Sequence, residues 1–181
     1  MVGEADEVPT ASAQIDELPI PMTSTPLAGF AGLYERHYET VFRAALRVTG
    51  NPADAEDVLQ TVFLRVLSQN EVGDAARRPT AYFRRAAVNA SVDLLRRRAV
   101  HAETVYDDRA PHAAVEPTTL LKERLRRAIA AIDSEDATLF LLRYVEGLSN
   151  EELAGVFQLE KNNVAVRLHR IRMRLQAEME R

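Results

Sequence analysis

The side chains of this sequence that could take part in chemistry are mainly arginines, whose usual ligand is phosphate. Seven of them lie at the two ends of one predicted helix: Arg77, Arg78, Arg84, Arg85, Arg96, Arg97 and Arg98. Three adjacent arginines face several directions around a helix, so the last three are typical of a cluster that neutralises a nucleic-acid backbone. Asn89, between the two groups, could contact a base or the backbone. For any single arginine, the alternative is an ordinary solvated surface position.

A second basic helix is predicted near the C-terminus, after residue 160. Its apolar positions recur at helical spacing: Val164, Leu168, Ile171 and Leu175. The basic residues lie on its other sides: Lys161, Arg167, Arg170, Arg172 and Arg174. Asn162 and Asn163 stand at the start of this helix, where amide side chains can reach base edges.

A short helix is predicted just before the basic one, and together they have the layout of a helix-turn-helix. Ser149 and Glu152 form an S-x-x-E capping box that starts the short helix, and the apolar pattern breaks at residues 158–160. A helix-turn-helix places its second helix in the DNA major groove. The alternative is a three-helix packing motif with no DNA role, but the amides and the basic run favour DNA contact.

Residues for metal binding and nucleophilic catalysis are poorly represented. The sequence has no cysteine, and its four histidines, at positions 37, 101, 112 and 169, show no metal-ligand spacing. It has no glycine-rich phosphate loop and no nucleophile elbow. We therefore expect no enzymatic activity, no metal and no cofactor.

The composition indicates an all-α fold. Of the 181 residues, 46% are apolar and only 6% are aromatic, and alanine, leucine and arginine outnumber the residues that favour β-strands. No apolar run reaches the ~18 residues of a membrane span, and the N-terminus has no signal-peptide pattern. We expect a cytoplasmic protein without membrane insertion.

Two small helical domains joined by a flexible linker are predicted. Residues 1–26 hold five acids, no base and few large apolar side chains, so they are predicted to be a disordered acidic tail. Residues 27–99 form the first domain and residues 120–181 the second, which contains the helix-turn-helix. Residues 100–119 contain two prolines and lack periodicity, which is typical of a linker.

The first domain is predicted to contain three helices. The first covers residues 28–49 and ends at Gly50, after which Asn51 is a good N-cap and Pro52 suits the first position of the next helix. That second helix has the clearest apolar stripe of the chain: Ala55, Val58, Leu59, Val62, Phe63, Val66 and Leu67. Leu64 lies on its polar side, which indicates a docking surface.

The remaining helices are marked by weaker patterns. The third runs from Pro79 to about Ala99, after a polar loop at residues 70–78, with a weak apolar stripe: Phe83, Ala86, Ala87, Ala90 and Leu94. The second domain begins with a helix marked by apolar residues: Leu121, Leu125, Ala128, Ile129 and Ile132. Ser134 is predicted to cap the next helix, which runs to Tyr144.

Residues 51–66, NPADAEDVLQTVFLRV, resemble a block of the bacterial RNA polymerase sigma factors of the extracytoplasmic-function type, in the primary-sigma superfamily. The resemblance covers about residues 28–99 and 120–178. In that family the block is the helix that docks on the clamp helices of the polymerase largest subunit. The resemblance implies a polymerase-binding set on this helix: Asp57, Gln60, Thr61, Leu64 and Arg65. Thr61 stands where the family usually has Glu.

Residues 79–97, PTAYFRRAAVNASVDLLRR, are similar to the promoter-melting helix of the same family. Tyr82 stands where Trp is usual, and Val88 where Arg is common. The resemblance implies that this helix and the loop at residues 70–78 bind the minus-ten element as a single strand, with the loop holding a flipped base. It assigns the minus-ten contacts to eight residues: Arg77, Arg78, Tyr82, Arg84, Arg85, Asn89, Arg96 and Arg97.

Residues 146–154, EGLSNEELA, closely match the family's domain for the minus-thirty-five element. The recognition helix departs more, because residues 162–167 read NNVAVR where GTVKSR is usual. The resemblance places the minus-thirty-five contacts at six positions: Lys161, Asn162, Asn163, Val166, Arg167 and Arg170.

The resemblance therefore implies an alternative sigma factor, which binds core RNA polymerase, directs it to specific promoters and assists promoter melting. Its expected partners are core RNA polymerase, promoter DNA and, where the cell has one, an anti-sigma factor. One alternative is a helix-turn-helix transcriptional regulator of the response-regulator output type, which would need a receiver domain. Another is a helical adaptor without DNA contact, which would leave the basic helices unexplained.

Overall fold

A computed structural model describes residues 26–68, 79–104 and 117–180, and the regular structure of these residues is α-helical. The helices are α1 (Pro26–Thr49), α2 (Pro52–Ser68), α4 (Pro79–Thr104), α5 (Pro117–Ala131), α6 (Ser134–Tyr144), α7 (Asn150–Phe157) and α8 (Lys161–Met179). This part of the chain contains no β-strand, so the all-α prediction is confirmed. None of its helices is long and apolar enough to cross a membrane. Nearly all of the predicted tail, the loop at residues 70–78 and most of the predicted linker lie outside the described residues.

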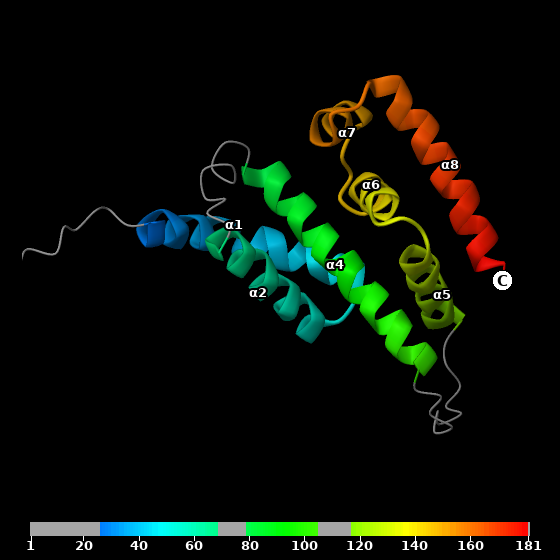
Figure 1. Cartoon of the computed structure of the whole chain (residues 1–181), viewed down its shortest axis with the longest axis horizontal. Helices are drawn as coiled ribbons and strands as arrows, with labels where there is room; N and C mark the ends of the chain where they lie inside the picture. The colour runs from blue at the N-terminus through cyan, green and yellow to red at the C-terminus, as the bar shows by residue number, and fades with distance from the viewer. Residues whose placement is uncertain (1–25, 69–78, 105–116, 181) are drawn as a thin grey trace, which may run out of the picture.

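Helix α4 occupies the centre of the helical arrangement (Figure 1). Helices α1 and α2 pack against one side of it, and α5 and α6 pack against another. Helix α8 packs on α5, α6 and α7, so the C-terminal helices form a group of their own beside α4. Both halves of the chain therefore use α4 as a packing surface.

The turn between α1 and α2 starts α2 as predicted. Gly50 adopts the left-handed conformation (φ 68°), which glycine reaches without a Cβ clash. The side-chain oxygen of Asn51 accepts hydrogen bonds from the backbone N–H groups of Ala53 and Asp54, at 2.9 and 3.4 Å. Because the first turn of a helix leaves these donors without a helical partner, Asn51 is the N-cap and Pro52 the first residue of α2.

Aromatic rings fill the core between α1, α2 and α4. The ring of Phe63 contacts those of Phe83 and Phe30, at centroid separations of 5.3 and 6.0 Å. The apolar stripe of α2 packs into this core as far as Val66. Leu67, predicted to belong to the stripe, is 39% exposed because it lies in the last turn of α2, beyond the packed residues.

Asp133 caps α6, and the prediction of Ser134 as the cap is wrong. Asp133 has extended backbone angles (φ −54°, ψ 141°), and its side chain accepts hydrogen bonds from the N–H groups of Glu135 and Asp136, at 2.9 and 3.2 Å. Ser134 is already the first helical residue, so its hydroxyl lies past the position from which a side chain caps the first turn.

We predict that Asp133→Ala lowers the free energy of unfolding by about 1 kcal/mol at neutral pH, whereas Ser134→Ala changes it little. The hydrogen bond from the Asp136 N–H lowers the pKa of Asp133 by more than partial burial raises it. Since the pKa is lower in the folded state, this stabilisation is complete above the ordinary value of 3.8 and is lost as the pH falls below it. Urea unfolding of both variants in neutral and acidic buffer measures the effect. A larger loss for Ser134→Ala would contradict the assignment.

Helices α7 and α8 form the predicted helix-turn-helix. The Ser149 hydroxyl accepts from the Glu152 N–H at 3.2 Å, and the Glu152 carboxylate accepts from the Ser149 N–H at 2.7 Å, so the capping box is confirmed. Gln158 ends α7 in the left-handed conformation (φ 55°), within the break predicted at residues 158–160. The inward positions of α8 are all buried, as predicted: Val164, Leu168, Ile171 and Leu175.

Helix α4 differs from its prediction in having two buried sides. One side carries the predicted stripe into the core with α1 and α2. The other side carries Val88, Val92 and Leu95, which are buried in the core of α5 to α8 although no predicted stripe included them. The helix also continues to Thr104, beyond its expected end near Ala99.

The start of α5 also departs from its prediction. Leu121, expected inside, is 56% exposed, because the first turns of α5 extend beyond the core. The later members of its stripe pack as predicted, with Leu125 half-buried and the rest buried: Ala128, Ile129 and Ile132.

Candidate nucleic-acid interface

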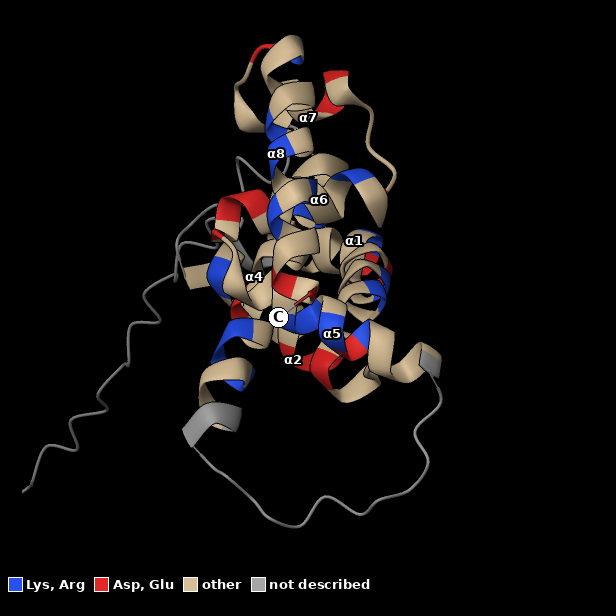
Figure 2. Ribbon diagram, turned by 90° about the vertical axis from the view of Figure 1, so that its right-hand side faces the viewer, with Lys and Arg blue, Asp and Glu red and all other residues tan. Residues whose placement is uncertain are grey.

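The outer side of α8 gathers most of the residues predicted to contact duplex DNA. Because the apolar stripe of α8 faces the core, the positions between its members point outward. Five of the six predicted residues are exposed: Lys161, Asn162, Asn163, Val166 and Arg170. Basic segments recur along this helix (blue in Figure 2). Lys161 lies 3.6 Å from Glu151 in an exposed ion pair, which is weak enough to exchange for a phosphate.

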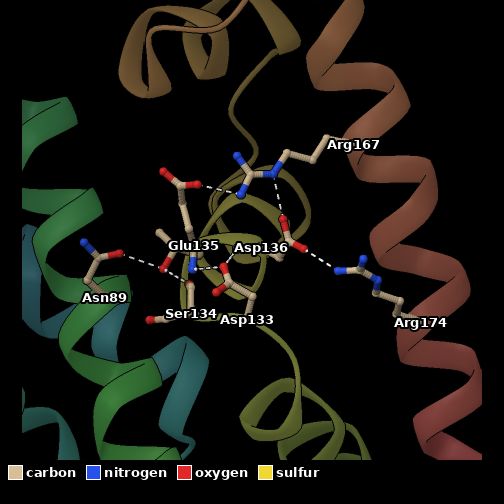
Figure 3. Close-up of polar contacts among 8 residues, drawn as sticks. Asn89, Asp133, Ser134, Glu135, Asp136, Arg167 and Arg174 are labelled. Atoms are coloured by element: carbon tan, nitrogen blue, oxygen red, sulfur yellow. Dashed lines mark hydrogen bonds and ion pairs between the residues drawn. The ribbon is translucent and has the colours of Figure 1, made fainter.

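Arg167, the sixth residue, is instead half-buried and bonded within the protein, with 28% of its side chain exposed. Its Nε donates to Asp136 Oδ1 and its Nη2 to Glu135 Oε2, both at 2.6 Å (Figure 3). Arg174 donates to the other oxygen of Asp136 at 3.0 Å. Burial lowers the pKa of Arg167, but the hydrogen bonds and charges of Glu135 and Asp136 together raise it by more. The pKa therefore lies above its ordinary value, and the guanidinium stays charged. These contacts tie α8 to the first turn of α6.

We predict that Asp136→Ala lowers the free energy of unfolding by about 2 kcal/mol, because it removes the acceptor of two charge-assisted hydrogen bonds. Glu135→Ala is the matched control, since it removes an exposed partner of the same arginine, with an expected loss of less than about 1 kcal/mol. Urea unfolding of both variants provides the measurement. Equal losses would show that Asp136 is not the main tie between α6 and α8.

The predicted minus-ten residues of α4 mostly face the C-terminal half of the chain. Arg85 Nη1 donates to the backbone carbonyl of Val156 at 2.7 Å. The Arg85 guanidinium also lies 4.8 Å from the centre of the Phe157 ring, within the range of a cation–π contact. Arg84 Nε lies 3.7 Å from a carboxylate oxygen of Glu146. These two arginines therefore contact α7 and the segment that precedes it.

Two more residues of the same set contact α5 and α6. The amide oxygen of Asn89 accepts a hydrogen bond from the Thr138 hydroxyl at 2.6 Å (Figure 3). Arg96 donates from Nε and Nη2 to the carbonyls of Ala130 and Ile132, at 3.2 and 2.9 Å. These carbonyls lie at the C-terminal end of α5, where the helix dipole attracts a cation.

Of the other members of the minus-ten set, Tyr82 lines a pocket with Arg84 and Arg85 beside α7. Arg97 is exposed on α4. Tyr82 is half-buried, with its ring edge-to-face against Phe83 at a centroid separation of 5.3 Å. Arg77 and Arg78 lie outside the described residues. The structure therefore brings together Arg84, Arg85, Asn89 and Arg96, but at an internal surface.

The predicted polymerase-binding set lies together on the outer side of α2. All five residues are exposed: Asp57, Gln60, Thr61, Leu64 and Arg65. Leu64 is 63% exposed, among the most exposed large apolar side chains of the described residues. Because the apolar stripe of α2 is turned into the core, the described residues leave Leu64 exposed on this outer side, which suits a docking surface.

Comparison with known proteins follows the two halves of the chain. Residues 33–100 match the family described as Sigma-70 region 2, and residues 122–175 match Sigma-70, region 4. The sigma factor SigL of Mycobacterium tuberculosis, of the extracytoplasmic-function type, is 30% identical over 76% of this chain and 81% of its own length. The RNA polymerase sigma-E factor of Streptomyces avermitilis is 29% identical over 78% of this chain and 80% of its own. The solved structure of CnrH with the cytosolic domain of CnrY covers 87% of this chain and 91% of that chain, with 22% identity and a TM-score of 0.49.

Proposed function

Because the chain belongs to the RNA polymerase sigma factors of the extracytoplasmic-function type, in the sigma-70 family, we propose that α2, α4 and α8 each carry one of its binding tasks. It is an alternative sigma factor of transcription initiation. The alternative of a response-regulator output protein is not favoured, because residues 33–100 match sigma region 2 where such a regulator needs a receiver domain.

The proposed division into domains is that of the two sigma regions. Residues 27–99 form a region 2-like domain for core polymerase and the minus-ten element, and residues 120–181 form a region 4-like domain for the minus-thirty-five element. Residues 100–119 connect them, and residues 1–26 are an acidic tail. The ranges of the two family matches support these boundaries.

Core RNA polymerase binds the outer side of α2 in this proposal. Asp57, Gln60 and Arg65 supply polar contacts around the exposed Leu64, with Thr61 beside them. An apolar side chain surrounded by polar ones is the usual anatomy of a protein interface, in which a buried centre is enclosed by a polar rim.

The outer side of α8 reads duplex DNA at the minus-thirty-five element. The observation that carries this proposal is the exposure of Asn162 and Asn163 at the start of the second helix of a helix-turn-helix. The N-terminal residues of such a helix reach base edges in the major groove, and paired amide contacts suit adenine. Lys161 and Arg170 neutralise phosphates on either side of these amides.

The chain performs no chemistry of its own in this proposal and needs no cofactor or metal. Base pairs open because unpaired bases gain stacking and hydrogen bonds in protein pockets, while basic side chains hold the displaced strand. We place the protein in the cytoplasm with its polymerase, and we propose an anti-sigma factor as a further partner.

In vitro transcription tests the proposed function directly. Core RNA polymerase with fragmented genomic DNA is incubated with and without the full chain, and the 5′ ends of the transcripts are sequenced. We expect new start sites that depend on the chain and share two upstream sequence elements. Transcripts that are the same with and without the chain would contradict the proposal.

A further inference from the structure

The side of α4 that carries Arg84, Arg85, Asn89 and Arg96 is covered by the C-terminal half of the chain. We propose that this packing is a closed state, in which the C-terminal half occupies the surface that binds single-stranded promoter DNA. The inference rests on the proposed role of α4 in promoter melting. It adds that the chain must open along this interface before α4 can hold a DNA strand.

Buried apolar residues hold the covered side of α4 against the C-terminal half. Val88 and Val92 have no exposed surface, and Leu95 is almost as deeply buried, in a core that also includes Val48 at the end of α1. They share one hydrophobic core with α5 to α8, in which Ile129 and Leu139 are also buried. Opening exposes both sides of this packing to water, so the free chain favours the closed state, and a bound DNA strand or polymerase compensates for the lost burial when it opens.

The polar groups of the covered side are already bonded to the C-terminal half. Arg85 and Arg96 donate to backbone carbonyls, and Asn89 is bonded to the hydroxyl of Thr138. These are the N–H donors and the amide that would bind phosphates and bases. A DNA strand and the C-terminal half therefore compete for the same atoms.

Glu146, between α6 and α7, is the acidic residue that closes the interface. Its side chain is only 2% exposed, and its carboxylate accepts from Arg47 Nη1 at 2.9 Å and lies 3.7 Å from Arg84 Nε. A buried carboxylate between two arginines from α1 and α4 occupies the place that a phosphate would take on Arg84. Glu146 thus links the two halves without belonging to any proposed DNA-binding set.

The other two proposed binding sides remain accessible in the closed state. The outer sides of α2 and α8 both point away from α4 and are exposed. A closed chain can therefore dock on polymerase through α2 and contact duplex DNA through α8, while its α4 cannot bind a single strand. Closure restricts DNA melting to the complex in which polymerase and promoter compensate for opening.

A cross-link that holds the interface shut tests this inference. The chain has no cysteine, so Arg47→Cys with Glu146→Cys introduces one reactive pair across the interface, outside the proposed DNA contacts. The full-length double variant is compared before and after reaction with a short bismaleimide. Two fluorescent probes measure binding by anisotropy: a single-stranded DNA of random sequence, and the same DNA as a duplex.

We expect the cross-linked protein to bind the single strand at least about ten-fold more weakly than the unreacted variant, because an open conformation is no longer available. Duplex binding through α8 should be the same in both forms. Equal single-strand binding before and after cross-linking would overturn the closed state. If neither form binds the single strand, the Glu146→Ala variant, in which the interface is weakened, decides the case. Its failure to bind the single strand as well, with duplex binding intact, would show that the proposed role of α4 fails and the closed state with it.

A second pair of variants tests the same interface without a cross-link. Glu146→Ala removes the carboxylate between Arg47 and Arg84, whereas Glu180→Ala makes the same change of charge just after α8, where the exposed carboxylate is bonded to Gln176. Stronger single-strand binding by Glu146→Ala than by Glu180→Ala supports closure by Glu146. An equal gain in both variants would reduce the effect to net charge and contradict a specific contact.

Discussion

Replacing Gln60 and Leu64 together by alanine is expected to weaken binding of the full chain to core RNA polymerase by roughly thirty-fold, or about 2 kcal/mol. Leu64 is exposed by 63% of its surface on the polar side of α2, whereas the apolar stripe packs into the core as far as Val66, so the apolar area of Leu64 is available to a partner. Gln60 lies one turn away on the same side and would lose its contact with the same partner. Binding is measured with labelled polymerase, and circular dichroism confirms that the helical content is retained.

Leu120→Ala provides the control for this prediction. Leu120 is an exposed leucine of similar exposure, but it lies at the start of α5, outside the proposed polymerase contacts. We expect its loss to leave polymerase binding unchanged. Unchanged binding of the α2 double variant, or an equal loss in Leu120→Ala, would remove the argument that α2 is the docking helix.

Local patterns in the sequence were sufficient to predict α2 and the helix-turn-helix. The apolar stripe of α2 repeats without interruption, and its start is marked by Asn51 and Pro52, which cap and begin it in the structure. The capping box of Ser149 and Glu152 likewise involves residues close in sequence. Such signals depend on neighbours within one helical turn, so the sequence contains all that is needed to interpret them.

Contacts between distant segments could not be predicted in the same way. Arg167 has the type and position of a base contact, yet it is bonded to Asp136, 31 residues earlier in the chain. Asp136 gives no signal of this role, because an acid in a first turn is already explained by the helix dipole. The bidentate pair of Arg98 with Asp54 connects α4 to α2 in a similar way.

The side of α4 that packs on the C-terminal helices could be predicted only in part. Val88, Val92 and Leu95 follow helical spacing, so a second apolar side can be found in the sequence beside the stripe through Phe83. The sequence does not show which helices cover that side, because an apolar stripe predicts burial without identifying the element that packs on it. The arginines beside it fit phosphates and protein carbonyls equally well, so the sequence suggested DNA where the closed fold places α5, α6 and α7.

At a promoter found by the transcription experiment, substitutions in α8 are expected to reduce duplex binding, and substitutions in α4 are expected to reduce strand opening. Asn162→Ala with Asn163→Ala removes two exposed amides at the start of α8, and a bidentate amide contact contributes ~1–3 kcal/mol. Binding to the upstream duplex should therefore weaken by roughly ten- to a hundred-fold and lose specificity. Tyr82→Ala with Arg97→Ala should leave that duplex binding intact but reduce permanganate reactivity of thymines in the minus-ten region, because the open strand loses a stacking partner and a cation.

Lys161→Ala separates base reading from phosphate binding in the same assay. Lys161 is exposed at the first position of α8, with only a weak ion pair to Glu151, so its loss should weaken binding equally on all sequences and make binding less dependent on salt. The amide double variant should instead lose the difference between the promoter and a scrambled duplex. If the α4 variants weaken upstream duplex binding as much as the α8 variants do, and strand opening in the complexes that form is normal, then α4 and α8 do not divide the task as proposed. Because Arg97 is exposed outside the side of α4 that packs on the C-terminal helices, replacing it leaves that packing intact, so its effect on strand opening reports a lost DNA contact.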